Sequence, residues 1–535
     1  MDSFEYDFAA NNFWGSKLLW FLLGYGLVEL GFAALVYFYW LPKLNAPRDP
    51  PIIRNYEDHT KRHKLFEKML LRQERLCEAL SIPIAPYFAQ FIRNWFFVLE
   101  EDSENEASEE TSLACIKETG LPCKEDIDKL ISWGYFNVDS AQITEEWQKR
   151  ELAIMYGMIK DRHGMSPGPK TRQKLQPVQM TIEPLDIKYR PLAVYIVFFI
   201  CKTIMALFLR WNGFSHHFSS TGLPYWYRPG GKQNNNNNSS QPLPFLFFHG
   251  IAPAGATFYV PMIMWGLATD ENGKVDRSIF LFENPAVAFG LTNHAPTEQE
   301  TVDGVWEAVD QHCGPKTEVS TCGHSFGTCL QTYVVHSSQG HRVRQMVLMD
   351  PVSILLSDPD VITNFVYSKM RVSKLHDSVP VLGAAGYVMN ELFIEHFLRR
   401  QFAWYNGELF LEDIPDHCQV IVCLSDRDEI LNAQKIKAHI DIHNGNTPSV
   451  PRCMKYLKES TSPNSSPRVV KKAGSTVSSS TSTMSLESAA NKVDLIYWEG
   501  EGVGHGYCLF DVSAWQLTRK RMSKGQQQIF KKKSL

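Results

Sequence analysis

The pentapeptide GHSFG, residues 323–327, places a serine between two glycines in the pattern G-x-S-x-G. A serine in this pattern is a candidate nucleophile when a strand precedes it and a helix follows, because the sharp turn between them exposes the hydroxyl group. The segment GPKTEVSTC predicts a strand that ends near Thr321, and GTCLQTYVVHSSQ predicts a helix directly afterwards. The sequence therefore supplies the local context that a nucleophilic Ser325 requires.

A nucleophilic serine also needs a general base, and the base needs a carboxylate that orients it. A strongly apolar strand is predicted over 420–424, and three acids follow it: Asp426, Asp428 and Glu429. A second strand is predicted over 495–498, followed by a glycine-rich loop that carries His505. The candidates thus follow Ser325 in the order acid, then histidine.

An oxyanion formed at a substrate carbonyl needs hydrogen-bond donors. The segment PLPFLFFHGIAPAG predicts a buried strand over 243–248 that runs into His249 and a glycine. We expect the backbone N–H groups of Ile251 and Phe326 to form an oxyanion hole, and losing one such donor typically costs about 2.7–4 kcal/mol of transition-state stabilisation. His249 is interpreted as a structural residue of this loop and not as a base.

Together these segments resemble the α/β-hydrolase family. The likeness covers residues 240–352 and 416–515 and rests on the HG loop, the GHSFG elbow, the strand QMVLMDPV and the two later strand–loop segments. It implies a mostly parallel sheet flanked by helices. Between the two parts lie residues 353–415, where the family usually has a helical cap, and their apolar and aromatic side chains at helical spacing favour a hydrophobic ester as substrate.

The same resemblance bears on the choice of acid. In the family the acid usually lies in a G-x-x-D-x-[IV]-[IV] turn, and the matching string here is SDRDEIL, with serine in place of the glycine. It implies Asp428 as the acid, His505 as the base and Ser325 as the nucleophile. Asp426 and Asp350 are the alternatives, the latter because some family members place the acid after the preceding strand.

Residues 18–41 form an apolar run long enough to cross a bilayer as a helix, with Glu29 as its only strongly acidic or basic residue. Tyrosine and tryptophan crowd its far end, as in an aromatic belt, and no small-residue cleavage site follows. We therefore predict a transmembrane anchor. Basic residues are more frequent after the run than before it, which places the following segment in the cytosol.

Residues 43–189 are predicted to be a mostly helical accessory region, with amphipathic helices near 56–80 and 141–161. The sequence assigns this region no function. A second apolar run, 191–209, carries Lys202 and is expected to span the membrane, lie in its interface or form a buried helix. If it spans, the domain after it lies on the opposite side of the membrane from 43–189.

Three low-complexity segments are predicted to be solvated: the acidic stretch 100–110, the Asn-rich 232–241 and a Ser/Thr-rich disordered insertion at 455–490. The formal net charge is −4 and no basic stripe is present, which argues against a nucleic-acid partner. Eleven cysteines without a C-x-x-C pair argue against a zinc ribbon or a disulfide framework. No metal or organic cofactor is expected.

These features predict a membrane-associated serine hydrolase that cleaves a lipid-like acyl ester, on an endomembrane such as the endoplasmic reticulum or a lipid-droplet surface. One alternative is an acyltransferase on the same fold. The H-x-x-x-x-D pattern of some such enzymes is absent, because His505 and Asp511 are one residue too far apart. The other alternative is a catalytically silent membrane-tethered scaffold.

Overall fold

The computed structural model describes residues 2–46, 58–98, 121–164, 167–168, 175–230, 242–269, 274–275, 277–367, 388–459, 492–500 and 502–533. The acidic stretch 100–110 and the Asn-rich segment 232–241 lie outside these ranges. So does most of the predicted Ser/Thr-rich insertion, whose first residues form α17 (Lys455–Glu459). The predictions for these segments therefore remain predictions.

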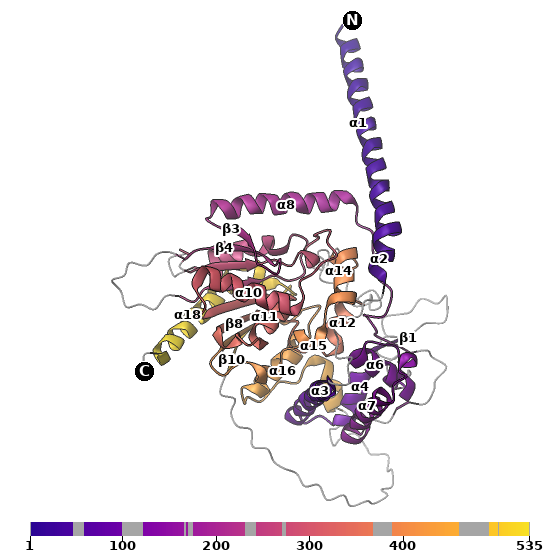
Figure 1. Ribbon diagram of the computed structural model, residues 1–535, viewed down its shortest axis with the longest axis vertical. Helices are drawn as coiled ribbons and strands as arrows, with labels where there is room; N and C mark the ends of the chain where they lie inside the picture. The colour runs from indigo at the N-terminus through magenta and orange to yellow at the C-terminus, as the bar shows by residue number, and fades with distance from the viewer. Residues whose placement is uncertain are drawn as a thin grey trace, which may run out of the picture.

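An eight-stranded sheet forms the centre of the molecule (Figure 1). Its order is β10-β9-β8-β7-β5-β6-β4-β3; neighbouring strands from β10 to β6 are parallel, and β4 and β3 add antiparallel. The inner strands are buried on both faces, which explains why their sequences are continuous apolar runs. The strands are β3 (Ser215–Phe218), β4 (Pro224–Arg228), β5 (Phe245–Phe248), β6 (Ile279–Phe282), β7 (Val319–His324), β8 (Val343–Met349), β9 (Gln419–Ser425) and β10 (Val493–Trp498).

Helices cover both faces of the sheet. On one face pack α10 (Glu298–Cys313), α11 (Gly327–His336) and α16 (Ala433–His443), and on the other α9 (Val260–Met262), η6 (Ile263–Leu267) and α18 (Val512–Lys533). This mostly parallel sheet with flanking helices is consistent with the predicted α/β-hydrolase fold. Short turns complete the layers: η5 (Gly255–Tyr259), η7 (Pro285–Val287), η8 (Gly340–Arg342), η12 (Arg452–Met454) and η13 (Tyr507–Leu509).

The sheet is larger than the sequence segments that predict it. Strands β3 and β4 precede the expected start of the core at residue 240, and α18 continues beyond its expected end at residue 515. Both strands are short, and β4 joins the sheet only by pairing with β6, more than fifty residues away in sequence. Local periodicity carries no information about such a distant partner.

The cap between β8 and β9 is helical where it is described. It contains α12 (Pro359–Phe365), α14 (Leu392–His396), η10 (Phe397–Gln401), α15 (Trp404–Gly407) and η11 (Leu411–Asp413). Its apolar side chains pack into the same core as those of α10, α11 and the face of the sheet that these two helices cover. The described part of 353–415 is thus helical, and its role as a cap over the active site stays a prediction.

The accessory region 58–180 supplies most of a second hydrophobic core, to which Tyr367 of the cap and Ala438 of α16 also belong. The region is mostly helical, with an additional antiparallel strand pair. The elements are α3 (His59–Leu80), α4 (Ile84–Arg93), β1 (Phe96–Val98), α6 (Lys124–Phe136), η3 (Ser140–Gln142), α7 (Glu146–Gly157), η4 (Met158–Arg162) and β2 (Leu175–Pro177). In Figure 1 it lies beside the cap and α16, and α3 contacts α16 directly. We call it the helical region below.

Two described helices are long and apolar enough to cross a membrane by length and composition. The first continues from α1 (Asp2–Ala34) through η1 (Leu35–Trp40) to α2 (Leu41–Asn45) and projects away from the body (Figure 1). The second, α8 (Leu192–Trp211), lies across the body, transverse to α1. They meet at Glu29, whose carboxylate accepts hydrogen bonds from the Leu192 N–H (3.1 Å) and the Tyr189 hydroxyl.

Candidate active site

Ser325 lies in a strained turn at the end of β7. Its φ is 51°, in the left-handed region that residues with a Cβ rarely adopt, and its N–H donates to the Met349 carbonyl (2.9 Å) at the end of the neighbouring strand. The flanking glycine is required by packing, because a Cβ at Gly327 would lie 2.1 Å from the Phe248 carbonyl oxygen. The strand runs to His324, three residues further than predicted, so the strand reaches the turn itself.

The turn stands at the point in the sheet where chain order reverses. From β5 the chain passes to β6 on one side and then to β7 on the other, so the loops after β5 and β7 separate and leave a crevice between them. Gly250, after β5, borders this crevice so closely that a Cβ there would lie 3.0 Å from the Ser325 Cβ. Fold and motif therefore bring Ser325 and the predicted oxyanion loop together.

His505 and Asp428 complete a hydrogen-bonded chain with Ser325. His505 Nε2 lies 2.9 Å from Ser325 Oγ, and His505 Nδ1 lies 2.6 Å from Asp428 Oδ2. The carboxylate is itself held, because its Oδ1 accepts the N–H groups of Ile430 and Leu431, both at 2.8 Å. A carboxylate only accepts hydrogen bonds, so Nδ1 carries the proton and Nε2 of the neutral ring faces the serine hydroxyl.

The electrostatics of the histidine follow from its surroundings. Burial alone lowers the pKa of His505, but the nearby charge and hydrogen bond of Asp428, with further charge from Asp350 and Glu429, raise it to about 9. Burial and the neighbouring Asp428 charge raise the pKa of Asp350. Each of these acids therefore stabilises the imidazolium, and protonation of Asp350 lowers the pKa of His505.

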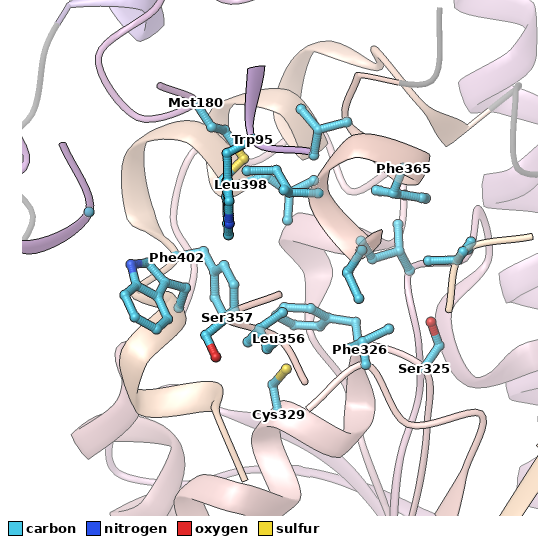
Figure 2. A pocket seen from close by; sticks show the side chains of 18 of the residues that line it. Trp95, Met180, Ser325, Phe326, Cys329, Leu356, Ser357, Phe365, Leu398 and Phe402 are labelled. Atoms are coloured by element: carbon cyan, nitrogen blue, oxygen red, sulfur yellow. The ribbon is translucent and has the colours of Figure 1, made fainter. Parts of the chain in front are cut away.

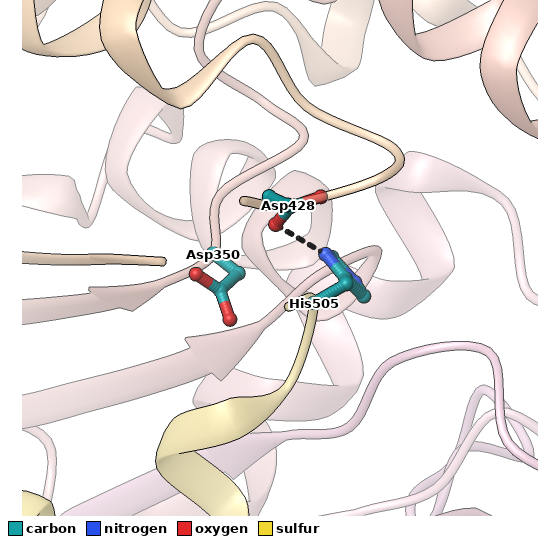
Figure 3. Close-up of side chains that lie close together, drawn as sticks. All are labelled: Asp350, Asp428 and His505. Carbon is teal, nitrogen blue, oxygen red and sulfur yellow. Dashed lines mark hydrogen bonds and ion pairs between the residues drawn. The ribbon is translucent and has the colours of Figure 1, made fainter. Parts of the chain in front are cut away.

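The three candidate acids have different neighbours, and Figure 3 shows two of them, Asp350 and Asp428, together with His505. Asp428 faces His505. Asp350 instead accepts the N–H groups of Gly506 (2.8 Å) and Ser425 (3.0 Å), and so fixes the loop that carries the histidine. Asp426 faces away and binds the Tyr497 hydroxyl and the Gln434 amide.

Ligand atoms of Asp350, Asp428 and His505 lie within 4.8 Å of one another, a spacing that metal sites share. The hydrogen bonds above already engage the carboxylate oxygens and Nδ1. These ligand atoms therefore already have hydrogen-bond partners within the protein.

The predicted oxyanion donors border the serine. Among the described residues, neither the Ile251 N–H nor the Phe326 N–H has a hydrogen-bond acceptor. The Tyr259 hydroxyl accepts the Gly250 N–H (3.1 Å) and lies 3.0 Å from His324 Nδ1, which fixes the loop against the elbow. Two amides without acceptors beside a serine hydroxyl form a suitable site for a developing oxyanion.

His249 has a structural environment. Its Nδ1 donates to the Gly250 carbonyl (2.7 Å), and its Nε2 accepts the Asn284 N–H (3.0 Å). Burial lowers its pKa to about 4, so the ring is neutral and both nitrogens are engaged. This environment agrees with the interpretation of His249 as a loop residue.

A cavity of about 370 Å³ begins at Ser325, within the usual range for ligand pockets. Cap side chains such as Phe365, Leu398 and Phe402 also line it (Figure 2). Its far wall is formed by the helical region, from which Trp95 and Met180 project toward it (Figure 2). The cavity is thus shared by two regions that are distant in sequence.

The sequence did not predict the residues that surround the hydrogen-bonded chain of Ser325, His505 and Asp428. Glu429, noted only as one of three acids, accepts the His505 N–H (3.0 Å). Asp350 was considered only as an alternative acid, although it anchors the same loop through Gly506. The far wall of the cavity had no signal in the sequence, because apolar residues on amphipathic helices look the same whether they fill a core or line a pocket.

No protein-family model and no curated protein matches this chain. Among solved structures it is similar to a membrane phospholipase A described as a bacterial virulence factor (12% identity, TM-score 0.34, 63% of this chain and 94% of that chain). It is also similar to carboxylesterase CesB from Bacillus subtilis (10%, 0.34, 63% and 99%) and to an esterase from Thermogutta terrifontis (12%, 0.33, 59% and 98%). At these identities and TM-scores the matches say nothing about this chain's substrate or mechanism.

Proposed function

We propose that the protein is a serine hydrolase that cleaves a carboxylic ester with a lipid-like acyl group. The observation that carries the proposal is the continuous chain from Ser325 Oγ to His505 Nε2 (2.9 Å) and from His505 Nδ1 to Asp428 (2.6 Å). The strained backbone of the serine and the two amides without acceptors beside it support the same function. A scaffold without activity has no use for all three features together.

The reaction follows from this arrangement. Ser325 Oγ attacks the ester carbonyl carbon while His505 Nε2 takes the hydroxyl proton, and the carbonyl oxygen becomes an oxyanion facing the Ile251 and Phe326 N–H groups. The C–O bond to the alcohol breaks, and His505 returns the proton to the leaving alkoxide. Water then attacks the acyl-enzyme, with His505 taking its proton, and the carboxylic acid leaves as the serine hydroxyl re-forms. Asp428 stabilises the imidazolium in both halves.

The cavity supports a lipid-like acyl group, because its lining is apolar and it opens directly at the serine. The test is a fluorophosphonate probe, which phosphonylates activated serines. Labelling of the full chain that disappears in Ser325→Ala is the expected result. Folded wild-type protein that is neither labelled nor able to hydrolyse any ester of a varied panel would refute the proposal.

We further propose that α8 lies in the membrane interface and does not cross the bilayer. The regions before and after α8 contact each other through buried charges: Arg72 of α3 pairs with Glu408, and Arg399 bonds the Met180 carbonyl (3.2 Å). A bilayer cannot separate two regions that share a buried interface. One face of α8 packs on the body, whereas its other face exposes apolar side chains: Ile196, Val197, Phe199, Ile200, Ile204, Leu207 and Trp211.

The opening of the cavity lies near this surface. Phe258 (42% exposed) and Phe510 (73% exposed) line the cavity and are its exposed side chains among the described residues. Phe258 belongs to η5, which contacts α8. A substrate dissolved in the membrane would therefore enter without passing through water.

Epitope tags in the 100–110 segment and at the C-terminus test this arrangement. In membranes containing the full chain, both tags are expected to be cleaved by protease from the same side. Protection of one tag and cleavage of the other would mean that α8 crosses the bilayer.

A further inference from the structure

The helical region forms one wall of the cavity that begins at the nucleophile. From this region α3, α4 and α6 contribute apolar side chains to the lining, among them Leu70, Phe88 and Ile131. A native interior is packed without voids much larger than a water molecule, so an apolar cavity of about 370 Å³ is unusual as a packing defect. Its continuity with Ser325 indicates that it holds part of the substrate.

Two polar side chains in the lining, Gln73 and Ser357, are already engaged by protein groups. Gln73 donates to Asp358 (3.0 Å) and accepts the Tyr87 hydroxyl, while the Ser357 hydroxyl accepts a hydrogen bond from Arg72 (2.6 Å). The rest of the lining that the helical region contributes is mostly apolar. The part of the substrate that occupies this part of the cavity is therefore a hydrocarbon, because a buried polar group without a partner is unfavourable.

The wall is held firmly against the catalytic core. Arg72 on α3 lies between the carboxylates of Glu408 and Asp358, and Lys435 on α16 pairs with Asp358 on its other side. These four side chains are nearly inaccessible to solvent, and two positive charges balance two negative ones. Removing one partner of such a buried set leaves an uncompensated charge, so the helical region has a fixed position.

The position of His505 relative to the leaving group decides which half of the ester lies in the cavity. His505 must protonate the leaving alcohol, so the alcohol lies on the side of the His505 loop. That loop leads to Phe510 at the exposed end of the cavity. The acyl chain then has the opposite end, toward the helical region.

We propose that the helical region, residues 58–180, is an acyl-binding domain that receives the long hydrocarbon chain of the acyl group and sets the acyl-length preference of the enzyme. This inference rests on the proposed ester hydrolysis at Ser325. It assigns a substrate class, esters of long-chain carboxylic acids, and a role to a region that has no recognisable motif.

Gly134 offers a test that fills the far end without removing a contact. It borders the cavity on α6, and a Cβ added there would meet no heavy atom within 4 Å. Gly134→Phe is compatible with the helix, since glycine is among the poorest helix formers. Gly157→Phe is the matched control: this glycine also lies on a helix of the same region with no atom closer than 3.9 Å, and it does not line the cavity.

The assay compares kcat/KM for p-nitrophenyl esters from acetate to palmitate, with thermal unfolding as a check on folding. For the wild type we expect kcat/KM to rise by up to about fourfold per added methylene until the cavity is filled. Gly134→Phe is expected to retain acetate and butyrate hydrolysis within about twofold and to lose at least about tenfold on the longest esters. Gly157→Phe is expected to match the wild type at every length.

Two further experiments make the result unambiguous: a second variant, and substrates in which the long chain belongs to the alcohol instead of the acyl group. Trp95→Ala enlarges the far end and is expected to move the preference to longer acyl chains. Acetate esters of long-chain alcohols are expected to be unaffected by Gly134→Phe, and a dependence on the alcohol chain instead would overturn the acyl assignment. Normal hydrolysis with no change in length preference in either variant would refute the acyl-binding role alone. Absence of any hydrolysis or Ser325 labelling would refute the proposed function itself.

Discussion

The carboxyl edge of the sheet and the helical region contribute to one cavity in opposite ways. At the sheet edge, polar groups lie at defined hydrogen-bond distances, and backbone segments at strand ends fix each of them. In the helical region, the lining is made mostly of apolar side chains from several helices. In the proposed function, chemistry depends on a few atoms at the sheet edge, whereas the preferred acyl length depends on the packed volume of the cavity. Mutations in the two regions should therefore have separable effects.

The largest effect is expected at the sheet edge. Ser325→Ala should reduce kcat for every ester by at least about 10⁴-fold, because removing the nucleophile eliminates the acyl-enzyme route. Thermal stability should change little, and a long-chain fatty acid should still bind in the cavity. Isothermal titration with palmitate would show this separation, and loss of palmitate binding together with activity would contradict it.

The acids at the sheet edge offer a sharper comparison. Asp428→Asn should lower kcat by about 10⁴-fold, since the amide favours the wrong histidine tautomer. Asp426→Asn, two residues away and facing Tyr497, should keep most of the activity. Steady-state kinetics of the purified variants would decide between them. A larger loss in Asp426→Asn would show that the acid was assigned incorrectly.

The boundary between the two regions is expected to control stability more than chemistry. Arg72→Met leaves the buried Glu408 carboxylate without its main partner, and breaking such a pair costs about 3–5 kcal/mol. Denaturant unfolding should detect this loss. Lys149→Met, which removes an exposed partner of Glu146, is the control and should change stability by less than about 1 kcal/mol. Equal effects would mean that the buried charges do not hold the regions together.

The smallest expected effect is a shift in pH dependence. The hydrolase needs neutral His505, so kcat/KM rises as pH increases through the pKa of that group. The Asp350 charge helps to raise this pKa, and Asp350→Asn should therefore move the acidic limb of the profile to lower pH. Asp494→Asn on β10, where the carboxylate faces Arg521, should leave the profile in place. A shift to higher pH would show that Asp350 acts on His505 only through loop geometry.

The candidate relay was predictable because each part follows a recognisable strand. Ser325 has glycines that the turn requires, and Asp428 and His505 follow apolar runs of strand length. Parallel strands bring such loops to one edge, so order along the chain predicts proximity in space. Asp350 and Glu429 were not distinguishable in the same way, because only the folded loop shows that they bind Gly506 and the His505 backbone.

Other features depended on partners distant in sequence. β4 joins the sheet through β6, and Arg72 meets Glu408 across 336 residues. The orientation of α8 was undecided from composition alone, since a spanning helix and an interfacial helix are both apolar. The contacts between the regions on either side of α8 support the interfacial placement that we propose.

The sequence by itself indicated the chemistry that we propose, the order of the candidate reacting groups and two apolar helices long enough to cross a membrane. These properties are local, because turns, strand ends and apolar runs follow from neighbouring residues. Only the tertiary structure decided which acid faces His505, how α8 lies and where the cavity ends. Those depend on the directions in which distant side chains meet, and the helical region has a part in the site only because Arg72, Trp95 and Met180 fold against the core.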